Sequence, residues 1–205
     1  TLRAHATAEL LMNRYGVLTK GSVPIDVQGG FAMLYKVLTG LEEAGRCQRG
    51  YFVESLGGAQ FAGAATVDRL RGYADTVDRA EPEHHALVLA AADPANPYGC
   101  ALPWPVTDPG HRPGRKAGAL VVLVDGQLVA YLERGGRTLL TFTSDAMVLR
   151  AAGIAVADLV GAGRLDGILI AKVNGMSVLE TPHADAVEAL LAAGFTRTPR
   201  GLRLR

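Results

Sequence analysis

Residues 46–62, RCQRGYFVESLGGAQFA, contain two short extended segments on either side of a glycine pair. Two sets of side chains alternate from Arg46 to Glu54, with the period expected of a strand. Gly57 and Gly58 allow the backbone to reverse before residues 59–61 resume an extended path. The stretch therefore predicts a β-hairpin. It is either the wing of a helical module or a plain hairpin of an α+β domain without a ligand.

The residues before this hairpin predict two helices, with a short strand and a short helix or turn between them. Residues 5–15 have helical spacing and end at Gly16, residues 17–19 suit a short strand that pairs with the hairpin, and a short helix or turn follows over 19–27. Residues 31–44 form a longer helix that Gly45 ends. Its apolar residues recur at three and four positions and predict one buried stripe, formed by Phe31, Leu34, Leu38 and Leu41. A helix, a short helix, a longer helix and a hairpin make up a winged helix.

The third helix of a winged helix usually enters the major groove of DNA. Its exposed face offers Lys36 but also Glu42 and Glu43, and residues 1–55 carry nearly equal numbers of basic and acidic residues. The whole chain has a formal charge of +1, with 21 Lys and Arg against 20 Asp and Glu, so no global basic field draws in nucleic acid. The module alone should bind DNA weakly, or it serves only as a packing module.

The second half of the chain is β-rich. A helix over 64–79 leads to a domain boundary near 81–85, and an apolar strand follows over 86–92. Further strands are predicted at about 118–124, 127–133 and 137–142, with two-residue turns at Asp125-Gly126 and Gly135-Gly136. Then come a helix from Ser144 to about 162, a hairpin over 168–181 turned at Asn174-Gly175, a helix over 182–193 and an arginine-rich tail.

The predicted fold class is therefore α+β. A winged helix-turn-helix occupies residues 1–80, and a small β-barrel with two interleaved helices occupies residues 85–205.

A proline-rich loop joins the strand at 86–92 to the next strand. It contains Trp104, which is the single tryptophan, together with Arg112, Arg115 and Lys116. An exposed tryptophan beside cations could stack on an unpaired base while the cations contact phosphate. Alternatively, Trp104 is the apolar plug that holds the loop down. The arginines of the tail are either a contact surface or a solvated end.

The sequence contains no recognisable catalytic or metal motif. The nearest string to a phosphate-binding loop, PGRKAG at 113–118, lacks the required glycine spacing and hydroxyl, so no ATP hydrolysis is expected from these residues. The five histidines lack the spacing of a zinc site. Cys47 and Cys100 fit a reduced intracellular protein, and no apolar run reaches membrane-spanning length. The start at Thr1 suggests a piece of a longer protein.

Several segments in a consistent order resemble the C-terminal region of the large helicase-related (Lhr) proteins. They are LLMNRYGVLTKGSV at 10–23, GGFAMLYKVLTGLEEAGR at 29–46, RGYFVESLGGAQFA at 49–62, DPANPYGCALPWP at 93–105, GALVVLVDGQLVAYLERGGRTLLTF at 118–142 and TPRGLRLR at 198–205. The resemblance implies a DNA-repair protein with an ATP-dependent 3′-to-5′ helicase in its N-terminal portion. It also implies winged helices and a β-barrel similar to the AlkZ-like DNA glycosylases, with oligomerisation and, in some members, uracil-DNA glycosylase activity.

Two features of this sequence depart from those families. The helicase motifs are absent, so ATP and Mg²⁺ would belong to the helicase portion and no cofactor is expected here. The glutamine-x-glutamine motif of the AlkZ-like enzymes is absent too, because Gln28, Gln48, Gln60 and Gln127 stand alone. No catalytic residue can be carried over.

Two hypotheses remain: a module for DNA binding and oligomerisation, and part of a uracil-DNA glycosylase. The expected partners are DNA and further copies of the chain, without a membrane, and the expected location is the cytoplasm in association with the nucleoid. The predicted DNA contacts are Lys36, Arg46, Arg49, Trp104, Arg112, Arg115 and Lys116.

Overall fold

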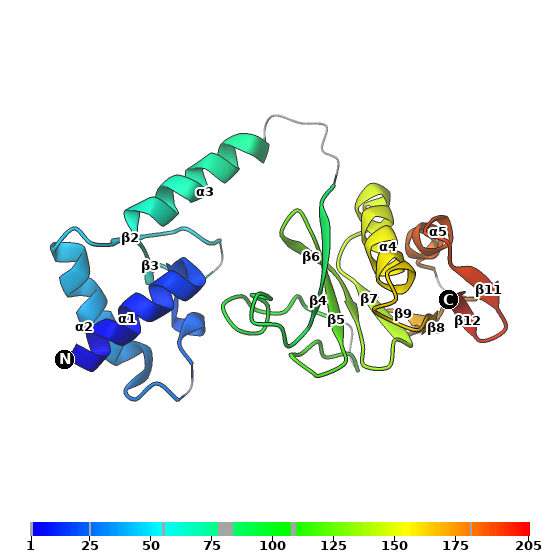
Figure 1. The fold of residues 1–205 in the computed structure, drawn as a ribbon, viewed down its shortest axis with the longest axis horizontal. Coiled ribbons are helices and arrows are strands. Elements are labelled where there is room, and N and C mark those ends of the chain that lie inside the picture. The colour runs from blue at the N-terminus through cyan, green and yellow to red at the C-terminus, as the bar shows by residue number, and fades with distance from the viewer. Residues whose placement is uncertain (1, 25, 55, 78–83, 108–109, 181) are drawn as a thin grey trace. The chain divides into compact units, whose positions relative to one another are not determined.

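The computed structural model describes residues 2–24, 26–54, 56–77, 84–107, 110–180 and 182–205. The chain divides into two compact units (Figure 1), the first formed by residues 1–82 with 100–103 and the second by residues 83–99 with 104–205. The predicted domain boundary near 81–85 falls largely outside the described residues.

The first unit is a small helical module with a three-stranded antiparallel sheet. The strands lie in the order β1-β3-β2, so β3 pairs with β1 on one side and with β2 on the other. Both the hairpin and the short strand before it are confirmed. The elements are α1 (Leu2–Tyr15), β1 (Val17–Leu18), the 3₁₀ turn η1 (Lys20–Ser22), α2 (Gly30–Glu43), β2 (Gln48–Gly50), β3 (Gln60–Ala62) and α3 (Ala64–Val77).

The core of the first unit forms where α2 packs against α1 and the sheet. Leu34 and Leu38 are completely buried and Leu41 nearly so, as the apolar stripe predicts. Phe31 lies at the margin of this cluster and is only partly buried. Cys47 is also buried, which raises the pKa of its thiol, with the nearby Glu42 carboxylate adding to the effect. The thiol donates to the carbonyl of Leu38, so it is a packing group.

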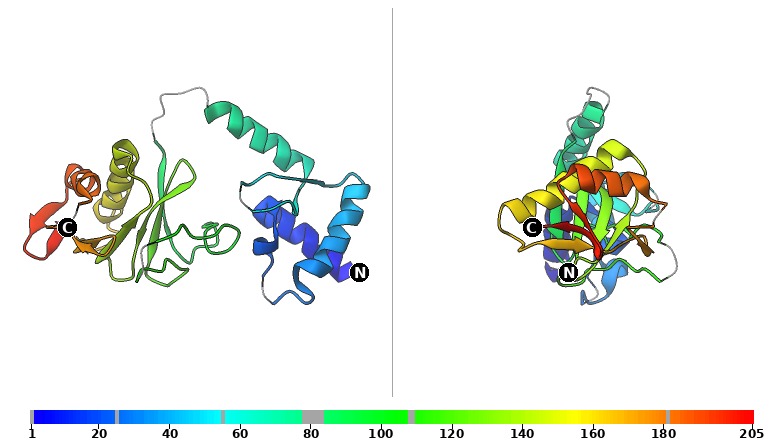
Figure 2. Two further views of the ribbon diagram at one scale, coloured as in Figure 1. Left: turned by 180° about the vertical axis from the view of Figure 1, so that it is seen from behind. Right: turned by 90° about the vertical axis from the view of Figure 1, so that its right-hand side faces the viewer.

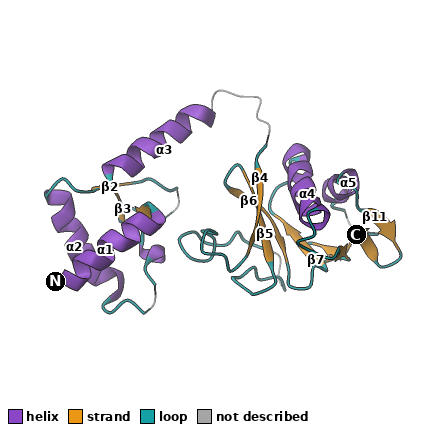
Figure 3. Cartoon of the chain, in the orientation of Figure 1, coloured by secondary structure: helices purple, strands orange, loops and turns teal. Residues whose placement is uncertain are grey.

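The second unit is built on a six-stranded sheet with the order β10-β9-β7-β6-β5-β4, and a three-stranded sheet with the order β11-β12-β8. Figure 3 shows its two helices beside these strands. All neighbouring strands are antiparallel except β7 and β9, which are parallel. The elements are β4 (Ala86–Ala90), β5 (Leu120–Val124), β6 (Gln127–Leu132), β7 (Thr138–Thr141), α4 (Ala146–Gly161), β8 (Ile168–Ile170), β9 (Lys172–Val173), β10 (Met176–Ser177), α5 (Ala184–Ala192), β11 (Thr196–Thr198) and β12 (Gly201–Leu204).

Two of the three predicted tight turns are confirmed. Asp125-Gly126 and Asn174-Gly175 both have positive φ at each position, from 48° to 83°, as a type I′ turn requires. The two-residue turn at Gly135-Gly136 is wrong, because β6 ends at Leu132 and β7 begins at Thr138, so these glycines lie within a longer connection. Helix α4 begins one residue later than predicted, after Asp145, whose carboxylate accepts from the amides of Met147 and Val148.

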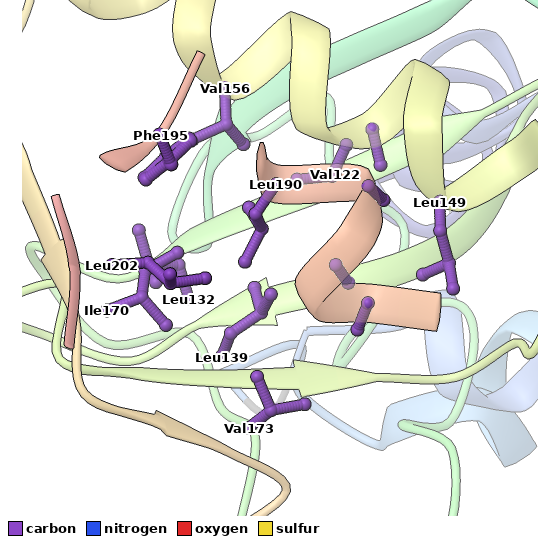
Figure 4. Packing of buried hydrophobic residues seen from close by; sticks show 14 of the residues in the cluster. Val122, Leu132, Leu139, Leu149, Val156, Ile170, Val173, Leu190, Phe195 and Leu202 are labelled. Carbon is purple, nitrogen blue, oxygen red and sulfur yellow. The ribbon is translucent and has the colours of Figure 1, made fainter. Parts of the chain in front are cut away.

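The predicted β-barrel is not confirmed. Within the described residues the larger sheet ends at β4 and β10 and does not close on itself. Helix α4 packs on β4, β5 and β6, and α5 packs on α4 (Figure 2), so helices cover the face that barrel closure would otherwise bury. The apolar core lies between these helices and the strands (Figure 4), and Leu149 and Val156 of α4 belong to the same buried cluster as Leu132 and Leu139 of the sheet.

None of the helices in the described ranges is both long enough and apolar enough to cross a membrane.

Candidate nucleic-acid interface

The outward face of α2 is the surface that a winged helix offers to a DNA groove. Lys36 lies in the middle of this face and is exposed. Ala32 and Gly40, about one turn before and after it, are exposed too. Alanine carries only a methyl group and glycine has no side chain, so the helix backbone lies close to the surface at these positions. The face is therefore nearly flat, and Lys36 is the cation at its centre.

The loop between β2 and β3 is held in shape by one buried side chain. Gln60 is completely buried, and its Oε1 accepts from the amides of Phe52 (3.0 Å) and Val53 (2.8 Å). Its Nε2 donates to the carbonyls of Val53 (2.8 Å) and Gly57 (2.7 Å). The amide thus makes four hydrogen bonds that would be costly to leave unmade in a buried position. These bonds give the wing a fixed shape. The sequence predicts the wing, but it does not reveal this role of Gln60.

The wing presents an exposed aromatic ring. Tyr51 is 84% exposed, which is unusual for a side chain with this much apolar surface. Its ring lies over Gly58, where an added Cβ would be 2.8 Å from the Tyr51 hydroxyl. Glycine at this position therefore leaves room for the end of the Tyr51 ring. Sequence reasoning did not select Tyr51 as a contact residue, although alternation places it on the same side as Arg49.

Arg49 and Arg46 are exposed, but both make ion pairs within the unit. Arg49 pairs with Glu42 (Nη2 to Oε2, 2.8 Å) and donates to the hydroxyl of Tyr35 (2.6 Å). The Glu42 carboxylate raises the pKa of Arg49 above its ordinary value. Arg46 pairs with Glu9 (Nη2 to Oε1, 2.7 Å). A phosphate would have to compete with these carboxylates to reach either arginine.

Arg115 of the proline-rich loop is a structural residue in this geometry. Its Nη1 donates to the carbonyls of Asn96 (2.7 Å) and Tyr98 (3.3 Å), and its Nη2 donates to those of Ala92 (3.2 Å) and Asp93 (2.8 Å). One guanidinium therefore holds two distant parts of the loop together. The sequence predicts Arg115 as a phosphate contact, because the residue is a cation in a surface loop. The carbonyl groups that it binds cannot be recognised from the sequence.

We expect Arg115→Met to lower the melting temperature and to leave the salt dependence of DNA binding unchanged. Methionine keeps much of the aliphatic stem but cannot donate to the four carbonyls. Circular dichroism melts and binding titrations of the same preparation measure the two quantities. The matched control for the melting temperature is Arg112→Met, at an exposed arginine three residues away. A reduced salt slope with an unchanged melt for Arg115→Met would instead assign Arg115 to DNA.

The other predicted contacts of this loop differ in their surroundings. Lys116 is exposed and its Nζ donates to the carbonyl of Arg112 (3.0 Å). Trp104 is partly buried and packs edge-on against Tyr131, with ring centroids 5.6 Å apart. Gly99 lies so close to the indole that a Cβ there would collide with it. This packing is the one that the plug interpretation of Trp104 predicts.

The predicted contacts thus fall into two groups. Lys36, Arg46 and Arg49 lie in the first unit, and Trp104, Arg112, Arg115 and Lys116 lie in the second. Within the described residues, Lys36 and Arg112 make no ion pair. No group of three or more His, Cys, Asp or Glu in that part of the chain could hold a metal ion.

The fold of the first unit, with its sheet order β1-β3-β2 and its structured wing, defines a winged-helix protein. Residues 1–82 match the family model of the winged-helix domain of the large helicase-related protein. The chain belongs to the large helicase-related family and corresponds to a C-terminal part of its members, as the sequence resemblance predicts.

Two relatives match nearly the whole chain. One is a protein of Mycolicibacterium smegmatis named Lhr helicase/probable uracil glycosylase, which is 64% identical over 211 aligned residues and 100% of this chain. The other is the Lhr helicase/uracil glycosylase of Escherichia coli, 38% identical over 207 residues and 98% of this chain. The chain spans only 14% and 13% of their respective lengths. A winged-helix domain in such a family fits DNA binding.

Proposed function

We propose that this chain is a DNA-binding module of an Lhr-type helicase. The observation that carries the proposal is the outward face of α2, where Lys36 stands between small residues beside a wing with a fixed shape. Helix-turn-helix proteins place such a face in the major groove, with neighbouring segments on the phosphates. DNA binding is supported both by this geometry and by the family to which the chain belongs.

The wing supplies the second part of the proposed contact. The exposed ring of Tyr51 can pack on a sugar or a base, while Arg46 and Arg49 exchange their carboxylate partners for phosphate. Exposed ion pairs are weak, so a phosphate can replace a carboxylate at little cost. Because few cations are involved, the affinity should be modest and should fall with salt.

We expect Lys36→Gln to weaken DNA binding by residues 1–205 and to lower the slope of log affinity against log salt by about one on duplex DNA, because one phosphate contact is lost. Fluorescence anisotropy at several salt concentrations gives both quantities. Lys172→Gln is the matched control, since Lys172 is an exposed lysine on β9 of the second unit. An unchanged slope for Lys36→Gln would remove α2 from the contact.

A second candidate function is a contribution to uracil excision, which the names of both relatives suggest. A glycosylase needs a group that positions water at the sugar once the base is flipped out. The second unit holds a partly buried pair, in which Nδ1 of His111 lies 3.2 Å from Oε1 of Glu133. An excision assay on single-stranded uracil DNA, with Glu133→Gln as the first variant, tests this function. No release of uracil by residues 1–205 would count against this function, and release that is unchanged in Glu133→Gln would exclude Glu133 as the group that positions water.

The remaining parts of the proposal concern the longer proteins. ATP and Mg²⁺ would act in the helicase portion, and a DNA-bound protein of this kind would be found with the nucleoid. Assembly of several copies through this region stays a prediction, which sedimentation of residues 1–205 tests.

A further inference from the structure

The three-stranded sheet β11-β12-β8 has one face in the core and one face outward. Ile170 of β8 and Leu202 of β12 are completely buried and face each other across the strands. Figure 4 shows both side chains pointing into the apolar core. Since side chains alternate along a strand, Arg203 of β12 and its partner Leu169 of β8 lie on the opposite, outward face.

This outward face is hollowed and positively charged. It forms an open hollow of about 610 Å³ lined by residues 166–169, 198–200 and 203–205. The lining includes three exposed arginines, Arg200, Arg203 and Arg205, against one carboxylate, that of Asp166. None of the three makes an ion pair with any residue that the structure describes. Because guanidinium groups stay charged at all physiological pH values, the hollow keeps its excess of positive charge.

The hairpin that carries these arginines has a fixed shape. Thr198 donates through its hydroxyl to the carbonyl of Gly201 (2.8 Å) and accepts from the amide of Arg200 (3.3 Å). Gly201 has a φ of 131°, and a Cβ there would collide with the carbonyl of Ile170. Glycine therefore permits β12 to lie close against β8. The tight connection keeps Arg200 on the rim of the hollow that Arg203 lines.

We propose that this hollow binds the phosphodiester backbone of a nucleic-acid strand, as a second contact in addition to that of the winged helix. The proposal rests on the function proposed above and assigns part of the DNA affinity to the second unit. Each guanidinium can donate to two oxygens of one phosphate. The arginines are spaced along an extended hairpin, as phosphates are spaced along a nucleic-acid strand. None of the described residues that line the hollow is aromatic, so these residues offer no platform on which a base could stack.

A backbone contact of this kind carries no base information. Removing it weakens binding to all sequences alike and lowers the salt dependence by an amount set by the number of phosphates lost. The double variant Arg200→Gln/Arg203→Gln removes two cations from the hollow, so the salt slope should fall by about two on duplex DNA and somewhat less on single strands.

The test measures affinity at several salt concentrations for residues 1–205 and three variants. They are the double glutamine variant, Arg203→Lys, which keeps the charge, and the control Arg197→Gln. Arg197 lies on β11 of the same hairpin and pairs with Leu202, on the other face. The proposal expects a reduced slope for the double variant alone, with unchanged melting temperatures for all three.

An unchanged slope for the double variant, with a reduced slope for Lys36→Gln, would overturn this inference and leave the proposed function standing. An equal reduction of the salt slope for Arg197→Gln and for the double variant would also overturn it, because the slope would then depend on the net charge of the protein and not on the hollow. Binding of inorganic phosphate that needs Arg203, together with a DNA affinity that is unchanged in the double variant, would show a site for free anions instead of a strand. Wild-type protein that binds no DNA at any salt concentration would remove both proposals.

Discussion

Leu38→Ala should lower the free energy of unfolding by about 2–5 kcal/mol, the range for a leucine truncated in a packed core. Leu38 is completely buried in the cluster between α1, α2 and the small sheet. Alanine removes the side-chain atoms that fill this space, and the wing that follows α2 loses part of its support. Urea unfolding of residues 1–205, followed by circular dichroism, measures the change.

Leu10→Ala is the matched control for this substitution. Leu10 lies in α1 and is 65% exposed, and alanine is the best helix former, so the same change there should cost little. Equal effects of the two substitutions would contradict the buried stripe, and with it the assignment of α2 as the central helix of the winged helix.

Trp104→Ala should destabilise the protein by about 3 kcal/mol, near the low end for a tryptophan truncation because the side chain is partly exposed. The indole packs on Tyr131 and Gly99, so its loss opens a gap beneath the proline-rich loop. The affinity for single-stranded DNA should stay unchanged for the folded fraction. Unfolding curves and binding titrations of one preparation measure both quantities.

Two further variants sharpen this result. Trp104→Phe keeps an aromatic ring in contact with Tyr131 and should recover much of the stability. Val106→Ala changes a residue of the same loop that is 99% exposed, and it should have no measurable effect on stability. If Trp104→Ala leaves the unfolding curve unchanged and weakens single-strand binding about tenfold or more, the indole stacks on a base and the plug interpretation is wrong.

The elements of the first unit follow from the sequence because their signals are local. Gly16 and Gly45 follow the ends of α1 and α2, and the spacing of Leu34, Leu38 and Leu41 defines the buried face of α2. The turns at Asp125-Gly126 and Asn174-Gly175 are equally local, since the type I′ geometry selects these residues. Gly135-Gly136 shows the limit of this reasoning, because a glycine pair also serves a longer connection.

The candidate contacts were harder to predict because partners distant in sequence decide the role of a cation. Arg49 and Arg115 look alike in the sequence, yet one pairs with Glu42 and the other holds carbonyls from Ala92 to Tyr98. The predicted barrel is not confirmed for a related reason, since strand patterns do not show whether a helix such as α4 covers the face of the sheet. The burial of Gln60 could not be predicted from the sequence, because glutamine side chains are mostly exposed.

The most direct test of the DNA-binding module is amide chemical-shift mapping of residues 1–205 titrated with a short duplex. We expect the resonances of Ala32, Lys36 and Gly40 on α2 and of Tyr51 in the wing to shift or broaden, and the changes at Ala32, Gly40 and Tyr51 to be smaller in Lys36→Gln at the same concentrations of DNA and salt. Resonances of the buried face, such as Leu38, should change much less. Shifts confined to other elements, with α2 and the wing unchanged at saturating DNA, would contradict the account.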